Sequence, residues 1–302
     1  MRPIKDIISI RDFERADIEN ILERAEFMED SLNKKAGLNL LKNKILANLF
    51  FEPSTRTRMS FESAMFRLGG KCISFSRDDS SMKKGENLED TLKNIDGYCD
   101  VVVIRHPNAG AARFAARVCN SPVINAGDGS NQHPTQTLLD LFTMKKMKGA
   151  LDGVNIGIVG DLKFGRTVHS LVYALSMFGA NITLVSPVEL KMPRHIIKEI
   201  EEKFATDVKE IRKLTKNLNF DIIYVTRIQK ERFPDILEYE RIRKSYRVEP
   251  EVLGKDTIVM HPLPRVDEID RKIDGTAHAV YFKQAHLGIP VRMAVLDILM
   301  GN

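Results

Sequence analysis

The sequence lacks most of the features that mark exported, zinc-binding and membrane proteins. Its three cysteines, Cys72, Cys99 and Cys119, show neither CxxC nor Cys/His spacing, so no disulfide framework and no zinc site is expected. No apolar run is long enough to cross a bilayer, and the N-terminus has no continuous apolar segment. We therefore expect a soluble chain in the reducing cytoplasm, without contact to a membrane.

The sequence also lacks a large excess of either positive or negative charge. The chain has 46 basic and 41 acidic residues, a net charge of +5 and a pI near 9.0, without a basic tail. Tryptophan is absent and no stripe of alternating basic and aromatic residues occurs, which argues against a nucleic-acid partner. The small excess of positive charge favours anionic small molecules instead.

The chain is long enough for more than one hydrophobic core. Its 302 residues are 43% hydrophobic, and a single core rarely organises a chain of that length, so two domains are expected. Short apolar runs alternate with amphipathic helical stretches, which predicts an α/β fold with two mostly parallel sheets flanked by helices. The predicted strands are 44–50, 71–75, 100–104, 122–125, 154–159, 181–185, 221–225, 256–260 and 278–281.

One long helix is predicted to join the two sets of strands. It runs from Thr135 to Lys148 and ends in the glycine-flanked stretch 149–153, where a hinge is expected. Two polar stretches, 77–87 and 227–247, are typical of lids over a binding site. No internal repeat or low-complexity tract is present.

The stretch Phe-Glu-Pro-Ser-Thr-Arg-Thr-Arg at 51–58 is the strongest functional signal. It follows the apolar strand 44–50 and opens a helix for which Ser54 and Thr55 suit the N-cap. A helix start with unpaired N–H groups binds anions, and the two arginines add charge, so we interpret the stretch as a phosphate cradle. An ordinary capped helix with solvated arginines is the alternative. The helix is predicted to bury Met59, Phe61, Met65, Phe66 and Leu68.

Two further polar sites in the first half follow strands directly. Arg105 comes after the valine-rich strand 101–104, at the strand end where open α/β sheets bind ligands. The loop 127–136 brings His133 and Gln136 to a helix start, where a neutral imidazole can donate a hydrogen bond to a carbonyl oxygen. A surface arginine and a structural helix cap are the alternative interpretations.

The second half repeats this arrangement with carboxylate-binding groups. The stretch 156–166 is a strand, a glycine turn and a helix start carrying Arg166; it resembles a dinucleotide fingerprint but lacks GxGxxG. Arg227 and Gln229 follow another strand and suit a carboxylate. The prolines of 261–265 leave backbone carbonyls on a stiff loop that can accept from an ammonium or amide. Each could also be a plain connector.

Together these motifs resemble the catalytic chains of aspartate carbamoyltransferases over nearly the whole sequence. The motifs that carry the resemblance are FFEPSTRTRMSFE at 50–62, SSMKKGE at 80–86, VIRHP at 103–107, GDGSNQHPTQTLLD at 127–140, GDLKFGRTVHSL at 160–171, TRIQKERF at 226–233 and HPLPRVDEI at 261–269. The resemblance implies the carbamoyltransferase fold and transfer of the carbamoyl group of carbamoyl phosphate to L-aspartate, the step of de novo pyrimidine biosynthesis that gives N-carbamoyl-L-aspartate and phosphate.

The resemblance also implies the residues of the site. Carbamoyl phosphate is expected to contact Ser54, Thr55, Arg56, Thr57, Ser80, Lys84, Arg105, His133, Gln136 and the carbonyls of Leu263 and Pro264. Aspartate is expected to contact Lys84, Arg166, Arg227 and Gln229. Among these the catalytic group comprises Thr55, Arg56, Lys84, Arg105 and His133. Ser80, preferred over Ser81, and Lys84 would come from a neighbouring subunit of a homotrimer.

Domain boundaries and partners follow from the same resemblance. Residues 1–134, completed by a C-terminal helix 287–302, are expected to bind carbamoyl phosphate, and residues 135–286 to bind aspartate. No cofactor and no metal is expected in this chain; any zinc would belong to regulatory chains, whose presence the sequence leaves open.

Ornithine carbamoyltransferase is the nearest alternative. That relative typically carries a cysteine in the loop occupied here by Pro262 and Leu263. Two arginines with Gln229 also suit a dicarboxylate, whereas a cationic substrate would need acidic groups. A dinucleotide-binding dehydrogenase is a more remote alternative, weakened by the missing GxGxxG.

Overall fold

The computed structural model describes residues 4–35, 37–76, 85–215, 218–228 and 246–301. The chain divides into two compact units. Unit 1 is Met1–Phe142 with Leu287–Asn302, and unit 2 is Thr143–His286. The division falls within a helix, a few residues after the boundary expected at 134/135. No helix in the described ranges is long and apolar enough to span a membrane.

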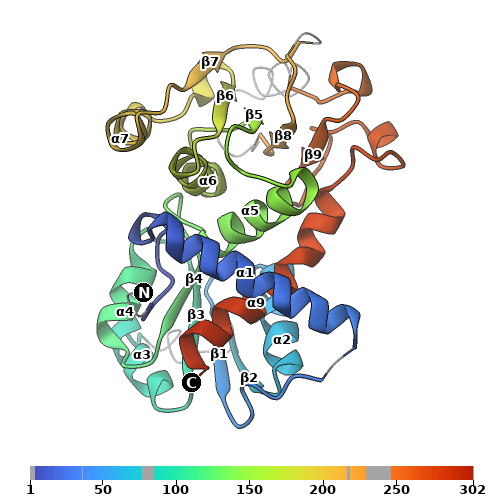
Figure 1. Ribbon diagram of the computed structural model, residues 1–302. Coiled ribbons are helices and arrows are strands. Elements are labelled where there is room, and N and C mark those ends of the chain that lie inside the picture. Colours follow the sequence, from blue (N-terminus) through green and yellow to red (C-terminus); the bar gives the residue numbers. More distant parts are fainter. Residues whose placement is uncertain (1–3, 36, 77–84, 216–217, 229–245, 302) are drawn as a thin grey trace. The chain divides into compact units, whose positions relative to one another are not determined.

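Unit 1 is built on a four-stranded sheet in the order β2-β1-β3-β4 (Figure 1), in which every neighbouring pair is parallel. The strands are β1 (Ile45–Phe50), β2 (Lys71–Ser76), β3 (Val101–His106) and β4 (Val123–Asp128). The helices are α1 (Arg15–Asn33), α2 (Thr55–Arg67), α3 (Leu88–Asp96), α4 (Ala111–Val118), α5 (Pro134–Lys148) and α9 (Tyr281–Met300), with a 3-10 turn at Ile10–Asp12. Helices α5 and α9 are each divided between the two units.

Helices cover both faces of this sheet. Leu49, Val102 and Ile104 pack with Ala112 and Ala115 of α4 on one face. On the other face the Ser74 hydroxyl donates to Glu62 of α2, at 2.9 Å. Helices α1 and α9 lie side by side in Figure 1, and the Arg24 guanidinium of α1 forms an ion pair with the Asp297 carboxylate of α9 at 2.6 Å. The C-terminal helix is therefore an integral part of the first unit.

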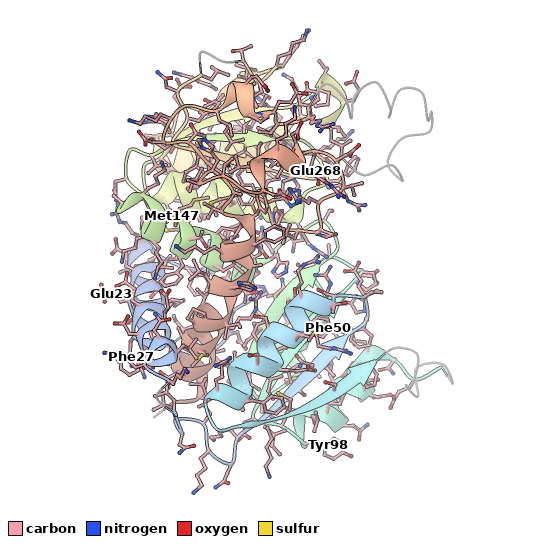
Figure 2. The ribbon with its side chains drawn as sticks, turned by 90° about the vertical axis from the view of Figure 1, so that its right-hand side faces the viewer. Glu23, Phe27, Phe50, Tyr98, Met147 and Glu268 are labelled. Carbon is pink, nitrogen blue, oxygen red and sulfur yellow. The ribbon has the colours of Figure 1, made fainter. Side chains whose placement is uncertain are left out.

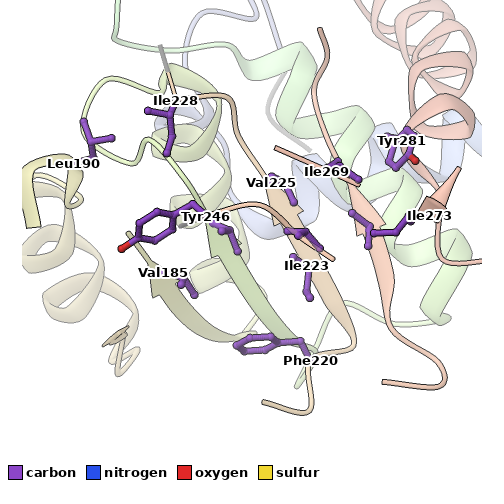
Figure 3. Packing of buried hydrophobic residues seen from close by; sticks show 13 residues of the cluster. Val185, Leu190, Phe220, Ile223, Val225, Ile228, Tyr246, Ile269, Ile273 and Tyr281 are labelled. Atoms are coloured by element: carbon purple, nitrogen blue, oxygen red, sulfur yellow. The ribbon is translucent and has the colours of Figure 1, made fainter. Parts of the chain in front are cut away.

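Unit 2 contains a five-stranded parallel sheet in the order β7-β6-β5-β8-β9. Its strands are β5 (Asn155–Val159), β6 (Asn181–Val185), β7 (Lys209–Ile211), β8 (Ile222–Val225) and β9 (Ile258–Met260). Its helices are α6 (Arg166–Met177) and α7 (Arg194–Phe204), with 3-10 turns at Val188–Leu190, Pro250–Val252 and Arg271–Ile273. Ile223 and Val225 of β8 lie in its core with Phe220 and Tyr246 (Figure 3).

Each sheet has one point at which the direction of strand addition reverses. In unit 1 the chain adds β2 on one side of β1 and then β3 and β4 on the other; in unit 2 it adds β6 and β7 beside β5, then β8 and β9 on the opposite side. Ligands of open parallel sheets bind beyond the carboxyl ends of the strands at such a point. The topology therefore marks the β1/β3 and β5/β8 ends as candidate sites.

The predicted fold class is confirmed, with three differences in the elements. Strand β7 (Lys209–Ile211) was not predicted, because its three residues include two exposed charged side chains. The predicted strand 278–281 is wrong: only Ala279 bridges to Val259, and α9 begins at Tyr281. Helix α9 also starts at Tyr281 rather than at the predicted residue 287, and Pro290 lies inside the helix.

The prediction for the apolar face of α2 is partly wrong. Phe61, Met65 and Leu68 are buried as expected, but Met59 and Phe66 are 57% and 60% exposed. At 100° per residue these two side chains lie on the opposite side of the helix from the sheet. Together with Glu62, Ser63 and Arg67 they line a groove on the surface.

Gly160, at the end of β5, offers a test of the packing in unit 2. Its φ is +119°, and a Cβ there would lie 2.3 Å from the Thr226 carbonyl oxygen. We expect Gly160→Ala to lower the free energy of unfolding by about 3 kcal/mol, from overpacking and backbone strain. Gly275→Ala, where no atom lies within 4 Å, is the matched control for urea denaturation. Equal stability of the two variants would contradict this account.

Candidate active site

The start of α2 has the geometry of an anion-binding site. It follows β1, whose last residue Phe50 is labelled in Figure 2. Ser54 occupies the N-cap position, with φ −158° and ψ 91°, but its hydroxyl accepts no capping hydrogen bond. The first backbone hydrogen bond of the helix runs from the Arg58 N–H to the Ser54 carbonyl, at 3.3 Å. The first-turn N–H groups therefore lie at the positive end of the helix dipole, and Ser54 and the exposed Arg56 belong to the same turn.

Arg105 is held beside this helix start by the sheet. The Phe51 N–H donates to the Arg105 carbonyl at 2.9 Å, which fixes the backbone of β3 against the end of β1. The Arg105 guanidinium donates to the Ala126 carbonyl at 3.0 Å and lies 3.5 Å from the Glu52 carboxylate. A guanidinium so fixed contributes charge to a ligand without a large loss of side-chain entropy.

The loop after β4 brings a histidine and a glutamine to the same edge of the sheet. Asp128 organises the loop, accepting from the Gln132 N–H at 3.1 Å and the Gly110 N–H at 2.7 Å. His133 precedes α5 and is 4% exposed, with its Nδ1 3.5 Å from the Thr135 hydroxyl. Because β1, β3 and β4 are neighbours, unit 1 places His133 at the same strand edge as the α2 start and Arg105.

Unit 2 places its two predicted carboxylate-binding arginines beyond adjacent strands. Arg166 is the first residue of α6, reached by the loop after β5, and Arg227 follows β8. Strands β5 and β8 pair through Val159 and Val225, and the Thr226 hydroxyl donates to the Val159 carbonyl at 3.2 Å. The two guanidinium-bearing segments therefore leave the sheet at its topological switch point.

The loop 261–264 follows the next strand, β9, and is fixed by a buried relay of hydrogen bonds. The Leu263 N–H donates to His261 Nδ1 at 2.8 Å, and Leu263 has a φ of +56°. Since Nδ1 accepts, the ring proton is on Nε2, which donates to the Glu268 carboxylate at 2.7 Å. Glu268, labelled in Figure 2, also accepts from the Val266 N–H at 2.9 Å. This relay fixes the backbone of the loop at Leu263.

Three of the predicted site residues, Ser80, Lys84 and Gln229, lie outside the described residues, as do most of the two predicted lids.

Within the described ranges no group of three histidine, cysteine or carboxylate side chains could hold a metal ion. The three thiols are poor nucleophiles, because burial raises the pKa of Cys72 to about 12 and that of Cys119 to about 11.

Three supporting carboxylates were missed by the sequence interpretation. Glu52 lies beside Arg105, Asp140 accepts from Gln136, and Glu268 orients His261. Only Asp140 carried a local signal, because it follows Gln136 by four residues on one helix. The partners of Glu52 and Glu268 depend on pairing between strands and on a loop conformation that spacing does not reveal.

Comparison with known proteins identifies two family matches that cover most of the chain. Residues 5–146 match the model described as "Aspartate/ornithine carbamoyltransferase, carbamoyl-P binding domain". Residues 152–299 match "Aspartate/ornithine carbamoyltransferase, Asp/Orn binding domain".

Similar proteins are found among both characterised sequences and solved structures. The aspartate carbamoyltransferase catalytic subunit of Thermococcus kodakarensis is 57% identical, with 98% of this chain and 97% of that protein covered. The catalytic subunit of M. jannaschii aspartate transcarbamoylase superposes with a TM-score of 0.92 at 52% identity, covering 98% of each chain. The Trypanosoma cruzi enzyme in complex with carbamoyl phosphate and aspartate gives 0.91 at 37% identity, covering 97% of this chain and 94% of that one.

The buried Glu268 carboxylate predicts a pH-dependent stability. Burial would raise the pKa of Glu268, but the hydrogen bonds from His261 and Val266 prevail and hold that pKa well below its ordinary value of 4.5. Stabilisation from a depressed pKa is present above about pH 4.5 and is lost as the pH falls below that value. The free energy of unfolding of the wild type should exceed that of Glu268→Gln by about 1–3 kcal/mol at pH 7.

The free energies of unfolding of both proteins, measured in urea from pH 7 to pH 3, check this expectation. The difference between them should shrink at the acidic end, because Glu268 of the unfolded wild type takes up a proton there while the folded protein keeps this carboxylate ionised, and glutamine does not titrate. A difference that stays constant over that range would contradict the assigned role of Glu268.

Proposed function

We propose a function on the premise that this chain belongs to the aspartate/ornithine carbamoyltransferase family. The chain transfers the carbamoyl group of carbamoyl phosphate to the amine of L-aspartate and releases N-carbamoyl-L-aspartate and phosphate. Its relatives at 54–57% identity are aspartate carbamoyltransferase catalytic subunits over nearly its whole length. The alternatives, an ornithine enzyme and a dehydrogenase, have no comparable support.

The observation that carries this proposal is the placing of anion-binding groups at both topological switch points. In unit 1 the start of α2 and Arg105 leave the adjacent strands β1 and β3. In unit 2 Arg166 and Arg227 leave the adjacent strands β5 and β8. One switch point then suits a phosphate and the other a dicarboxylate, as a reaction between two anions requires.

For carbamoyl phosphate, we assign the phosphate to the start of α2. Its contacts would be Ser54, Thr55, Arg56, Thr57 and Arg105. His133 and Gln136 would meet the carbonyl and amide ends, with the Leu263 and Pro264 carbonyls accepting from the carbamoyl nitrogen. Ser80 and Lys84 would complete the site from a neighbouring subunit.

For aspartate, we assign the carboxylates to Arg166 and Arg227, with Gln229 and Lys84. A planar guanidinium binds a carboxylate through two parallel hydrogen bonds, which fixes both its position and its orientation. Two such groups would hold the dicarboxylate so that its α-amine faces the carbamoyl carbon. Holding two reactants at reaction distance accounts for a large share of catalysis in two-substrate reactions.

The chemistry needs no covalent intermediate on the protein. The neutral amine of aspartate attacks the carbamoyl carbon, and a C–N bond forms as a tetrahedral intermediate develops. The C–O bond to phosphate then breaks, phosphate leaves with the electron pair, and a phosphate oxygen takes the amine proton. Thr55, Arg105 and His133 would stabilise the oxyanion, each donor contributing about 3 kcal/mol, while Arg56, Arg105 and Lys84 would stabilise the departing phosphate.

We propose that the chain works as a homotrimer with shared sites. Met59 and Phe66 are exposed on α2, on the same helix that begins with Thr55 and Arg56. An exposed apolar groove next to a binding site is typical of a subunit interface. In such a trimer Ser80 and Lys84 of a neighbouring subunit would complete the site.

We further propose that the reaction serves de novo pyrimidine biosynthesis in the cytoplasm. The relatives are named as aspartate carbamoyltransferase catalytic subunits, and the free cysteines Cys72, Cys99 and Cys119 suit a reducing compartment. The relatives are named as catalytic subunits, and a larger assembly of this protein would add regulatory chains to the catalytic trimer.

The identity of the acceptor tests the proposal most directly. Purified chain with carbamoyl phosphate should release phosphate and carbamoylated product with L-aspartate, and at least ~100-fold less with L-ornithine, because two arginines repel a cationic side chain. Phosphate assay and mass spectrometry of the product check this. Turnover with ornithine alone would transfer the chain to the sister activity.

Mixed subunits test whether sites are shared. Arg56→Ala and Lys84→Ala should each lower kcat by ~100-fold or more, since each removes a donor to the departing phosphate. Mixed trimers of the two variants should recover part of the activity, because some sites then receive Arg56 from one chain and Lys84 from another. Verified mixed trimers without recovered activity would rule out sharing.

A further inference from the structure

A buried arginine in the C-terminal helix has no role in the site as described so far. Arg292 of α9 is 3% exposed, and its Nη1 donates to the Ser60 hydroxyl of α2 at 2.9 Å. Its guanidinium carbon lies 5.1 Å from the centre of the Phe61 ring. A buried charge is costly unless an opposite charge compensates it, so Arg292 requires an explanation.

Asp140 of α5 is the opposite charge. It is fully buried, and its carboxylate raises the pKa of Arg292 against the larger effect of burial, which lowers that pKa to about 10. Packing independently places the guanidinium next to α5. A Cβ at Gly288 would lie 2.2 Å from Arg292 Nη1 and 3.2 Å from Leu139 Cδ2, so only a glycine there leaves room for both.

Asp140 in turn controls a residue of the proposed site. Gln136 Nε2 donates to Asp140 Oδ1 at 2.8 Å, one turn along α5, and Gln136 is 9% exposed. An ionised carboxylate only accepts hydrogen bonds, so the amide nitrogen must face Asp140. The amide oxygen of Gln136 is then directed away from Asp140, at the helix start that carries His133.

We propose that Asp140 and Arg292 are positioning residues, which hold the Gln136 amide with its oxygen toward the ligand, so that the site selects a donor with an N–H group beside the transferred carbonyl. The inference deepens the proposed function and rests on it. The amide oxygen of Gln136 would accept a hydrogen bond from the NH2 group of carbamoyl phosphate. A methyl group in the same position cannot donate that hydrogen bond. Rejection of a ligand that lacks a required N–H is strong, because a buried polar group then stays unpaired.

The arrangement also gives the C-terminal helix a function. Arg292 connects α9 to α2, which begins with the phosphate cradle, and balances the carboxylate on α5 that orients Gln136. Without the positive charge of Arg292, the buried Asp140 carboxylate would be less well compensated, and its hold on the Gln136 amide would weaken. Arg292 therefore acts on selectivity through Asp140.

The test compares carbamoyl phosphate with acetyl phosphate, which carries a methyl in place of the NH2. Calorimetric titration without aspartate gives both dissociation constants. We expect wild type to favour carbamoyl phosphate ~10-fold or more, and Asp140→Leu/Arg292→Met to retain a preference of ~3-fold or less. Affinity for acetyl phosphate should change by less than ~3-fold, because the phosphate cradle is untouched. Replacing both charges together leaves no unpaired charge in the core.

Arg24→Met/Asp297→Asn is the matched control, since it removes two opposite charges that hold α9 through the Arg24–Asp297 ion pair, far along the chain from Gln136. It should keep the wild-type preference. A cooperatively unfolding Asp140→Leu/Arg292→Met protein with the wild-type preference would overturn the inference. If that variant does not fold, the single variants Arg292→Lys and Arg292→Met are compared, because only lysine keeps the positive charge. An equal preference for carbamoyl phosphate over acetyl phosphate in these two variants would also overturn the inference.

Failure of the proposed function is distinguished by the wild type alone. Wild-type turnover with aspartate but equal affinity for the two acyl phosphates would remove the inference and leave the function standing. Absence of turnover with aspartate would count against the function itself.

Discussion

The convergence of helix starts and guanidinium groups at one edge of each parallel sheet is the feature on which the rest of this structure depends. Parallel strands produce it by bringing successive loops and helix starts to one edge, where N–H groups and guanidinium groups meet. In unit 1 the α2 start, Arg105 and His133 follow three neighbouring strands. In unit 2 Arg166, Arg227 and the 261–264 loop likewise follow three neighbouring strands, β5, β8 and β9.

Three carboxylates, of which Asp140 and Glu268 are buried and Glu52 is half-buried, hold these groups in place. Glu52 stands beside Arg105, Glu268 fixes the tautomer of His261 and thereby the Leu263 N–H, and Asp140 orients Gln136. Each carboxylate lies beside a donor or a positive group, so its burial does not leave an uncompensated charge. Rigid supports of this kind reduce the entropy lost when a ligand binds, which is the physical value of polar groups in an otherwise apolar interior.

Much of the fold could be predicted from local patterns. In the described part of the chain, eight of the nine strands follow from short apolar runs. Strand β7 is short and charged, and the run at 278–281 forms a single bridge and the start of α9 instead. Met59 and Phe66 were assigned to an apolar face because of their helical spacing, yet their positions around α2 expose them. Periodicity predicts that a helix is amphipathic, but neighbours decide which side is buried.

The sequence by itself determined the α/β class, the strand-end positions of Arg105, Arg166 and Arg227, and the motif at 51–58, because each depends on residues close together in the chain. Only the tertiary structure decided which strands became neighbours, and hence which loops share an edge. It alone joined Arg292 to Ser60 across 232 residues and brought that arginine to the α5 segment that carries Asp140. Such contacts arise from packing between distant segments, which no local propensity encodes.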